Sequence, residues 1–233
     1  MIYTNQYIMK TISTILSLLL ANVIAVAQSN IEITAGPSLT NVSVGGINDN
    51  LVPNRTLHTG LQAQILSGTS IGNHFEFVTG LAYKEKGFRV NEGIDMDVLN
   101  LPVHLGVEAI TTLRYLEVPL NLKYTASSGI VDVFAFAGPT VGYAMSGDVR
   151  TRANLIIDIN ISKTNLDLNQ NMYNRLEIGG NAGLGIGIPV GAGNVTAQVS
   201  YNHGFSRVID NTLIDFRLRN YGFGMNIGYK INL

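Results

Sequence analysis

Residues 221–233 read YGFGMNIGYKINL, and their apolar and polar positions alternate without interruption. Every odd-numbered position from Tyr221 to Leu233 is aromatic or aliphatic, whereas every even-numbered one is Gly, Asn or Lys. A period of two places all the apolar side chains on one face of a β-strand. Strands usually contain about 5–6 residues, whereas a strand that crosses a bilayer at a tilt needs about 9–11. The stretch therefore predicts a membrane-crossing strand.

Other segments of the chain repeat this alternation, which makes eight predicted strands in all. The seven earlier segments are approximately 31–43, 58–67, 74–88, 112–125, 130–144, 175–187 and 195–206. In the fifth of them both faces are apolar, because Phe134 and Phe136 lie opposite Val133 and Ala135. The alternation alone does not decide which face of that strand points inward.

The predicted connections differ in length on the two sides of the sheet. Short connections follow the second, fourth and sixth strands, at about 68–73, 126–129 and 188–194. Long ones follow the first, third, fifth and seventh, at about 44–57, 89–111, 145–174 and 207–216. Short turns on one side and long loops on the other are typical of outer-membrane barrels. We therefore expect an all-β protein, an eight-stranded antiparallel up-and-down transmembrane β-barrel.

Composition supports a barrel with an apolar outside. The mean hydropathy is +0.22 and only 13% of residues are charged, against about 25% in typical proteins. Beyond the N-terminal segment no stretch approaches the roughly 18 apolar residues of a membrane helix. The formal net charge of −1 gives no basis for nucleic-acid binding, and the absence of cysteine excludes disulfides and thiolate metal sites.

The N-terminal residues have the pattern of a secretory signal peptide. Lys10 precedes an apolar segment that ends in Ala25-Val26-Ala27, a small-x-small cleavage pattern. We predict a signal peptide over residues 1–27 and one barrel domain over 28–233. The first eight residues carry no positive charge, which favours Met9 as the start of translation. An N-terminal membrane anchor is the alternative, and the cleavage pattern argues against it.

Charged residues recur on the polar phase of the strands and are expected to point into a narrow lumen. They are Glu32, Glu76, Lys84, Lys86, Glu117, Lys123, Glu177 and Lys230. Buried charges need partners, because an unpaired buried charge is costly. We favour an ion-pair and hydrogen-bond network that plugs the barrel over a thin solute path or gate. Catalysis by these carboxylates is less favoured, since a filled lumen offers little room for a substrate.

Aromatic residues near the strand ends on the apolar phase are predicted to form girdles at the headgroup level. They are Phe75, Tyr83, Tyr124, Tyr201, Phe205 and Tyr229. An exposed aromatic patch for a protein partner is the alternative. Pro119 removes a hydrogen-bond donor in mid-strand, which predicts a local bulge.

The sequence offers no positive case for an enzyme, a metal site or a cofactor site. The four histidines, His58, His74, His104 and His203, lie in different segments without metal-ligand spacing. Pairing of His104 with a nearby loop aspartate, Asp95 or Asp97, is a weak hydrolase hypothesis. A Gly-x-Ser-x-Gly elbow is absent. We therefore expect a non-enzymatic protein.

Four motifs lie in order along the predicted strands: GLAYKEKGF at 80–88, YLEVPLNLKY at 115–124, Ala137-Gly138-Pro139 and Gly228-Tyr229-Lys230. Together they resemble the PorT family of outer-membrane β-barrel proteins. The resemblance implies an eight-stranded barrel in a Gram-negative outer membrane. It implies little about activity, since the family covers many uncharacterised barrels and a few tied to protein secretion.

The long loops are the expected place of specific function. We predict a scaffold or interaction protein of the outer membrane, with its N-terminus periplasmic and its long loops extracellular. Envelope or secretion proteins would bind at loops 89–111 and 145–174, and lipid would surround the barrel. The alternating apolar residues of 155–161 predict an extension of the neighbouring strands or, less favoured, a strand for partner addition. A narrow pore or gated channel is the alternative function, and a soluble lipocalin-like barrel a third.

Overall fold

The fold is a sheet of long antiparallel strands, seen in a computed structural model. The strands are β1 (Ser29–Gly45), β2 (Arg55–Ser70), β3 (Phe75–Val98), β4 (Leu101–Ser127), β5 (Asp132–Asn154), β6 (Asp158–Asn165), β7 (Leu176–Val190), β8 (Gly193–Gly204), β9 (Asp210–Asn211) and β10 (Phe216–Asn232). The described residues are 29–45, 55–98, 101–154, 158–168, 174–207, 210–211 and 216–233. The predicted signal peptide lies outside them. Within these ranges, no helix has the length and apolar character to cross a membrane.

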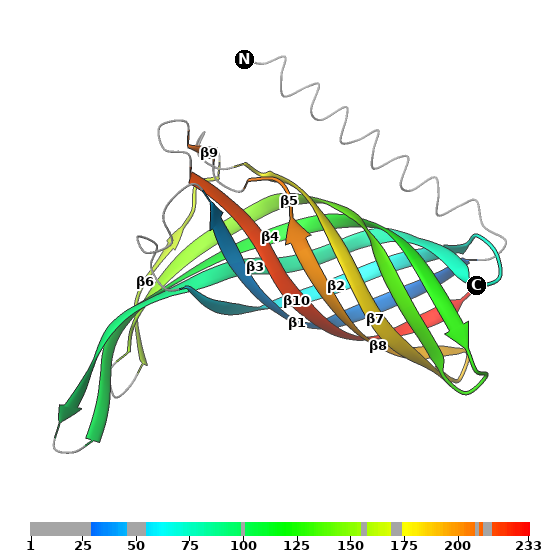
Figure 1. Ribbon diagram of the computed structural model, residues 1–233, viewed down its shortest axis with the longest axis horizontal. Coiled ribbons are helices and arrows are strands. Elements are labelled where there is room, and N and C mark those ends of the chain that lie inside the picture. Colours follow the sequence, from blue (N-terminus) through cyan, green and yellow to red (C-terminus); the bar gives the residue numbers. More distant parts are fainter. Residues whose placement is uncertain are drawn as a thin grey trace, which may run out of the picture.

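Eight of the strands in the described part close into a ring, which confirms the predicted eight-stranded barrel. They pair in the order β1, β2, β3, β4, β5, β7, β8 and β10, and β10 pairs back with β1. The closing ladder runs from Asn30 opposite Asn232 to Gly45 opposite Arg217. Closure leaves no open edge in the wall, as hydrocarbon requires of a spanning sheet. Figure 1 shows the tilted strands of this barrel from the side.

Three tight turns connect strands at one end of the barrel, which we call the turn end. They follow β2, β4 and β7 and match the short connections predicted from the sequence. The tightest joins Val190 to Gly193 through two residues. Gly191 adopts φ +64° there, the left-handed conformation that a two-residue hairpin turn favours. The C-terminus lies at this end of the barrel (Figure 1).

The predicted long loop at 89–111 is wrong, because β3 and β4 continue through most of it as one hairpin. Val98 pairs with Leu101, so only two residues separate the strands. The alternation of apolar and polar residues stops in this segment, but the main-chain pairing of β3 with β4 continues through it. In Figure 1 the hairpin runs well beyond the ring, at the lower left of the view.

A second hairpin occupies part of the predicted loop 145–174. Strand β5 continues to Asn154, and β6 pairs with it from Asn165 opposite Asp148 to Asp158 opposite Asn154. Of the residues 155–161, for which an extension of the neighbouring strands is favoured, 155–157 lie outside the described residues and 158–161 belong to β6. This strand differs from the favoured extension, since β6 ends at Asn165 and is separate from β7.

The barrel places polar groups inside and apolar groups outside. Among the described buried residues, polar and charged side chains outnumber hydrophobic ones. Each of the eight ring strands carries at least one large hydrophobic residue exposed on the outer wall. Ile65, Leu184 and Ile227 are examples. The ambiguous fifth strand turns Phe134 inward, at 3% exposure, and Val133 outward, at 55%.

The bulge predicted at Pro119 is wrong. Pairs on both sides of it, Thr79 with Leu120 and Ala82 with Glu117, keep one register between β3 and β4. On its other side Pro119 pairs with Thr140 of β5, again within one register. The register of the β4–β5 ladder shifts instead between Arg114 and Tyr115.

Candidate functional site

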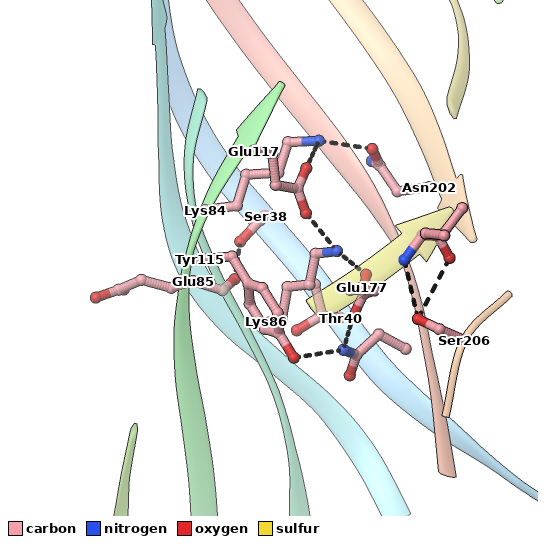
Figure 2. Close-up of polar contacts among 12 residues, drawn as sticks. Ser38, Thr40, Lys84, Glu85, Lys86, Tyr115, Glu117, Glu177, Asn202 and Ser206 are labelled. Atoms are coloured by element: carbon pink, nitrogen blue, oxygen red, sulfur yellow. Dashed lines mark hydrogen bonds and ion pairs between the residues drawn. The ribbon is translucent and has the colours of Figure 1, made fainter. Parts of the chain in front are cut away.

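The candidate site is the lumen, where charged side chains from several strands converge. Glu117 of β4 lies between two lysines of β3, and Figure 2 shows both ammonium groups directed at its carboxylate. The Lys84 Nζ is 2.9 Å from Glu117 Oε2, and the Lys86 Nζ is 2.5 Å from Glu117 Oε1. Lys84 also donates to the Oδ1 of Asn202 on β8, at 2.8 Å. This contact joins opposite walls of the barrel.

A second carboxylate extends this central cluster towards the loop end of the barrel, opposite the turn end. Lys86 forms a close ion pair with Glu177 of β7. The Nδ2 of Asn220 donates to Glu177 Oε2 at 2.5 Å and lies 3.5 Å from the Tyr115 hydroxyl. Lys86 also lies 5.0 Å from the centre of the Tyr115 ring. All polar ends in the cluster therefore have partners, as low-dielectric burial demands.

A separate cluster lies nearer the turn end and centres on Lys123 of β4. Its Nζ is 3.3 Å from Glu32 Oε2, 3.9 Å from Glu76 Oε2 and 4.0 Å from the centre of the Phe134 ring. The other carboxylate oxygens accept bonds from uncharged groups: Thr196 Oγ1 at 2.7 Å from Glu32, and Asn30 Nδ2 at Glu76. One ammonium thus offsets two buried carboxylates.

The structure brings together seven of the eight charged residues that sequence analysis assigned to the lumen. Lys230 differs: it is half-buried near the end of β10, and no carboxylate of the described ranges lies within ion-pair distance. Its position opposite Glu32 in the ladder does not lead to pairing, because Glu32 is directed to Lys123 and Thr196. The uncharged partners Asn30, Thr196, Asn202 and Asn220 also lie on the polar phase of their strands, but residue type alone did not predict their role.

Packing fills much of the remaining lumen. The rings of Phe134 and Phe136 occupy the space in front of Gly185 and Gly183, where a Cβ would collide with them. Nearer the loop end, an apolar cluster combines inward side chains with Leu168, which follows β6. It consists of Val42, Leu113, Tyr115, Ala144, Leu168 and Leu218. The polar clusters are therefore bounded by well-packed apolar groups.

Two small polar cavities remain between these layers. One touches Gln62, Lys84 and Asn202 and has about 10 Å³ open to the centres of water molecules. The other, with about 20 Å³, is lined by residues that include Asn121 and Asn181. Since one water needs roughly 10–15 Å³ by this measure, the first cavity has room for about one water and the second for one or two.

The six residues predicted as girdle aromatics lie at two levels. Phe75 and Tyr124 pack together at the turn end, with ring centres 5.2 Å apart, and the hydroxyl of Tyr229 donates to the Val190 carbonyl near the same end, at 2.9 Å. The other three, nearer the loop end, are Tyr83, Tyr201 and Phe205. Phe205 and Tyr201 are exposed, whereas Tyr83 is half-buried.

A further charged cluster, not anticipated from the sequence, lies on the outer wall beyond Tyr83. Because Glu85 separates two lumen lysines, its side chain points the opposite way, as Figure 2 shows. Arg114 Nε is 3.4 Å from Glu85 Oε1, and Arg114 Nη2 is 2.6 Å from Asp148 Oδ1. Arg150 Nε donates to Asp148 Oδ2 at 3.0 Å.

Asp148 is fully buried beneath these two arginines. Burial alone would raise the pKa of its carboxyl, but the hydrogen bonds and charges of Arg114 and Arg150 outweigh burial and hold that pKa below its ordinary value. Nearby His58 is also buried, which lowers the pKa of its imidazole together with the charge of Arg89. The cluster therefore holds an ionised carboxylate and a neutral imidazole at neutral pH.

Two sequence hypotheses, a metal site and a hydrolytic His–Asp pair, can be compared with the structure only in part. No three His, Cys, Asp or Glu side chains there form a ligand set. The ladder places Asp95 opposite His104 in the β3–β4 hairpin. The side chains of this pair fall outside the described part of the structure.

Solved structures similar to this chain are outer-membrane barrels. Neisserial surface protein A (NspA) has 13% identity and a TM-score of 0.41, over 87% of this chain and 96% of its own. Ail, the attachment invasion locus protein of Yersinia pestis, has 11% identity and a TM-score of 0.38, over 88% and 99%. The outer membrane protease OmpT from Escherichia coli has 8% identity and a TM-score of 0.38, over 89% and 97%.

The family comparison is more direct. No curated protein matches the sequence. Residues 26–210 match the family described as the outer membrane protein beta-barrel domain, and these residues contain most of the closed ring described above. An apolar outer wall, a polar lumen and this match agree on a location in the outer membrane. The chain belongs to the outer membrane protein β-barrel domain family.

Proposed function

We propose that this barrel is a non-enzymatic scaffold that presents the β3–β4 hairpin to a partner protein outside the membrane. In this proposal the N-terminus is periplasmic after removal of residues 1–27, and the long connections are extracellular. The partner belongs to the cell envelope or to a secretion assembly, in keeping with the resemblance to the PorT family.

The proposal rests on the outer part of the β3–β4 hairpin, where neither strand has a second neighbour in the described residues. Pairing of β2 with β3 ends at Val90, and pairing of β5 with β4 ends at Gly106. In the described residues, 91–98 therefore pair only with 101–108, and 101–105 pair only with 94–98; we call 91–98 and 101–105 the arm. A two-stranded ribbon is marginally stable alone in water, and its open edges can accept a strand from another protein.

The filled lumen supports a scaffold rather than an open conduit. Lys84 and Lys86 of β3 reach across the lumen to Asn202 of β8 and Glu177 of β7. The apolar cluster around Leu113 packs nearer the loop end. A solute would have to break buried ion pairs and displace packed side chains. In the part of the chain that the structure describes, strands project beyond the ring at the loop end.

The test is in-membrane crosslinking at native expression, followed by mass spectrometry of the joined proteins. In the test variant, residues 92–107 are replaced by Asn-Gly, which leaves the ladder partners Asn91 and Glu108 flanking a two-residue turn. We expect one reproducible partner with the natural chain and its loss in this variant.

A matched variant shortens the other hairpin. Replacement of 153–159 by Asn-Gly joins the ladder partners Arg152 and Asn160 by the same turn. This variant should keep the partner. Heat-modifiable migration in gel electrophoresis checks that both barrels fold. A partner retained without the arm, or no partner above background with the natural chain, would overturn the proposal.

A narrow gated channel is the second candidate, favoured by the two polar cavities on either side of Lys84. Displacement of the Lys84–Glu117 pair would connect them. Steady ion current from purified protein in planar bilayers would support this function. Current that rises when Glu117 is replaced by glutamine would assign the gate to the central cluster.

A further inference from the structure

The outer wall carries a basic patch made of Arg114, Arg150 and Lys163. The β5–β6 ladder pairs Arg150 directly with Lys163, and directly opposed residues on neighbouring strands point to the same face. Arg114 and Arg150 meet on Asp148, which is fully buried between them. The buried carboxylate of Asp148 therefore fixes the positions of both arginines in the patch.

The cations of the patch retain binding capacity after the internal pairing. Arg150 uses its Nε on Asp148, and its two terminal nitrogens have no partner within the described ranges. Lys163 is exposed, and no described carboxylate lies within ion-pair distance of it. Arginine nitrogens arranged as a fork match the oxygens of a phosphate group.

The patch lies at the level where lipid headgroups are expected. Tyr83 is two residues before Glu85 on the same face of β3, and its hydroxyl donates to Glu85 Oε1 at 3.0 Å. On β4, exposed Leu116 is two residues from Arg114. Two residues along a strand span about 7 Å, so the cations begin just beyond the apolar belt, where aromatic rings mark the interface.

We propose that Arg150 and Lys163 of this patch bind the phosphate of an anionic lipid headgroup in the leaflet that surrounds the loop end. The internal Asp148 orients both arginines, and the terminal nitrogens of Arg150 and the Lys163 ammonium contact the phosphate. Basic groups at a membrane surface attract anionic lipids. The inference uses the outer-membrane location alone and does not depend on a partner at the arm.

Native mass spectrometry of the folded, detergent-solubilised full chain tests this assignment. Phosphatidic acid and phosphatidylcholine with the same acyl chains are titrated separately, and the affinity for each lipid is measured. The variants are Arg150→Gln, Lys163→Gln and the double variant, all of which leave the Arg114–Asp148 pair intact. Arg219→Gln is the matched control, since Arg219 is also exposed near the loop end but lies on β10.

We expect each substitution in the patch to weaken phosphatidic acid binding about fivefold, with unchanged phosphatidylcholine binding and unchanged affinity in Arg219→Gln. Equal binding by the natural chain and the double variant would overturn the proposal. An equal loss in Arg219→Gln would also overturn it, since general surface charge would then suffice. A competition arm compares inorganic phosphate with chloride at equal ionic strength. Displacement of the lipid by phosphate well beyond chloride would assign the site to a soluble phosphate instead.

Discussion

The Nζ of Lys84 and the Oε2 of Glu117 are 2.9 Å apart in the middle of the lumen, where both side chains are almost fully buried. Glu117→Gln should lower the free energy of unfolding by about 3 kcal/mol or more, because removal of one partner leaves a buried charge uncompensated. Lys86 keeps Glu177 in this variant, so the loss falls mainly on Lys84. Urea titration of the folded fraction in lipid vesicles measures the effect.

Two further variants identify the cause of that loss. Lys84→Met in the Glu117→Gln background removes the uncompensated ammonium and should restore most of the stability. Lys230→Met, at a half-buried lysine without a carboxylate partner in the described residues, should change it by less than about 0.5 kcal/mol. A double variant no more stable than Glu117→Gln would contradict an ion-pair explanation.

Glycines of β7 provide space for the aromatic rings of β5. Gly185→Ala should destabilise the barrel by about 1–3 kcal/mol, because a Cβ at this position would collide with the Phe134 ring. Gly187→Ala is the matched control on the same strand, since its Cβ would make ordinary contacts, the nearest at 3.6 Å from Asp132 Cβ. Thermal unfolding followed by gel mobility gives both values.

A double-mutant cycle tests whether the loss in Gly185→Ala comes from a clash with the Phe134 ring. Phe134→Leu in the Gly185→Ala background should recover part of the lost stability, whereas Phe134→Leu alone should be destabilising through lost packing. The coupling energy from this double-mutant cycle should be clearly different from zero. Strictly additive effects would rule out a clash between the two side chains.

The strands and their faces were predictable from residue type because the two sides of a barrel wall meet opposite solvents. In residues 222–227 each apolar position is exposed on the outer wall and each polar or glycine position is buried toward the lumen, so composition and geometry share one period. Phe134 breaks this rule, since it faces the lumen. Its placement depends on Gly185 in another strand, and a pattern within one segment carries no such information.

The arm and the pairing partners were not predictable for a related reason. Main-chain pairing holds residues 91–98 against 101–108, and main-chain hydrogen bonds do not require alternating side chains. Likewise, the choice of Lys123 rather than Lys230 as the partner of Glu32 depends on side-chain reach across the lumen. Glu85 could have been assigned to the outer wall, since it separates two lysines of the lumen phase.

Acidification should weaken the outer-wall cluster through Asp148. Its pKa in the folded protein lies below the ordinary value because Arg114 and Arg150 stabilise the carboxylate more than burial disfavours it. A lowered folded-state pKa adds stability above the unfolded value of about 3.9, and that stability is lost as pH falls through the folded value. The stability difference between the natural chain and Asp148→Asn should therefore be constant near neutral pH and shrink below about pH 4. Parallel pH profiles of the two proteins would contradict this assignment.

Backbone protection should fall sharply from the ring into the arm. Each strand of the arm has one hydrogen-bonded neighbour in the described structure, whereas the same strands have two neighbours within the ring, for example at Lys123. Local opening needs few broken contacts in a two-stranded ribbon, so its amides exchange quickly. Hydrogen–deuterium exchange on the purified barrel should show fast exchange in 91–98 and 101–105 and slow exchange in 113–124. Equal protection of the two segments would mean that the arm is stable unaided, and the physical reason for it to bind a partner strand would disappear.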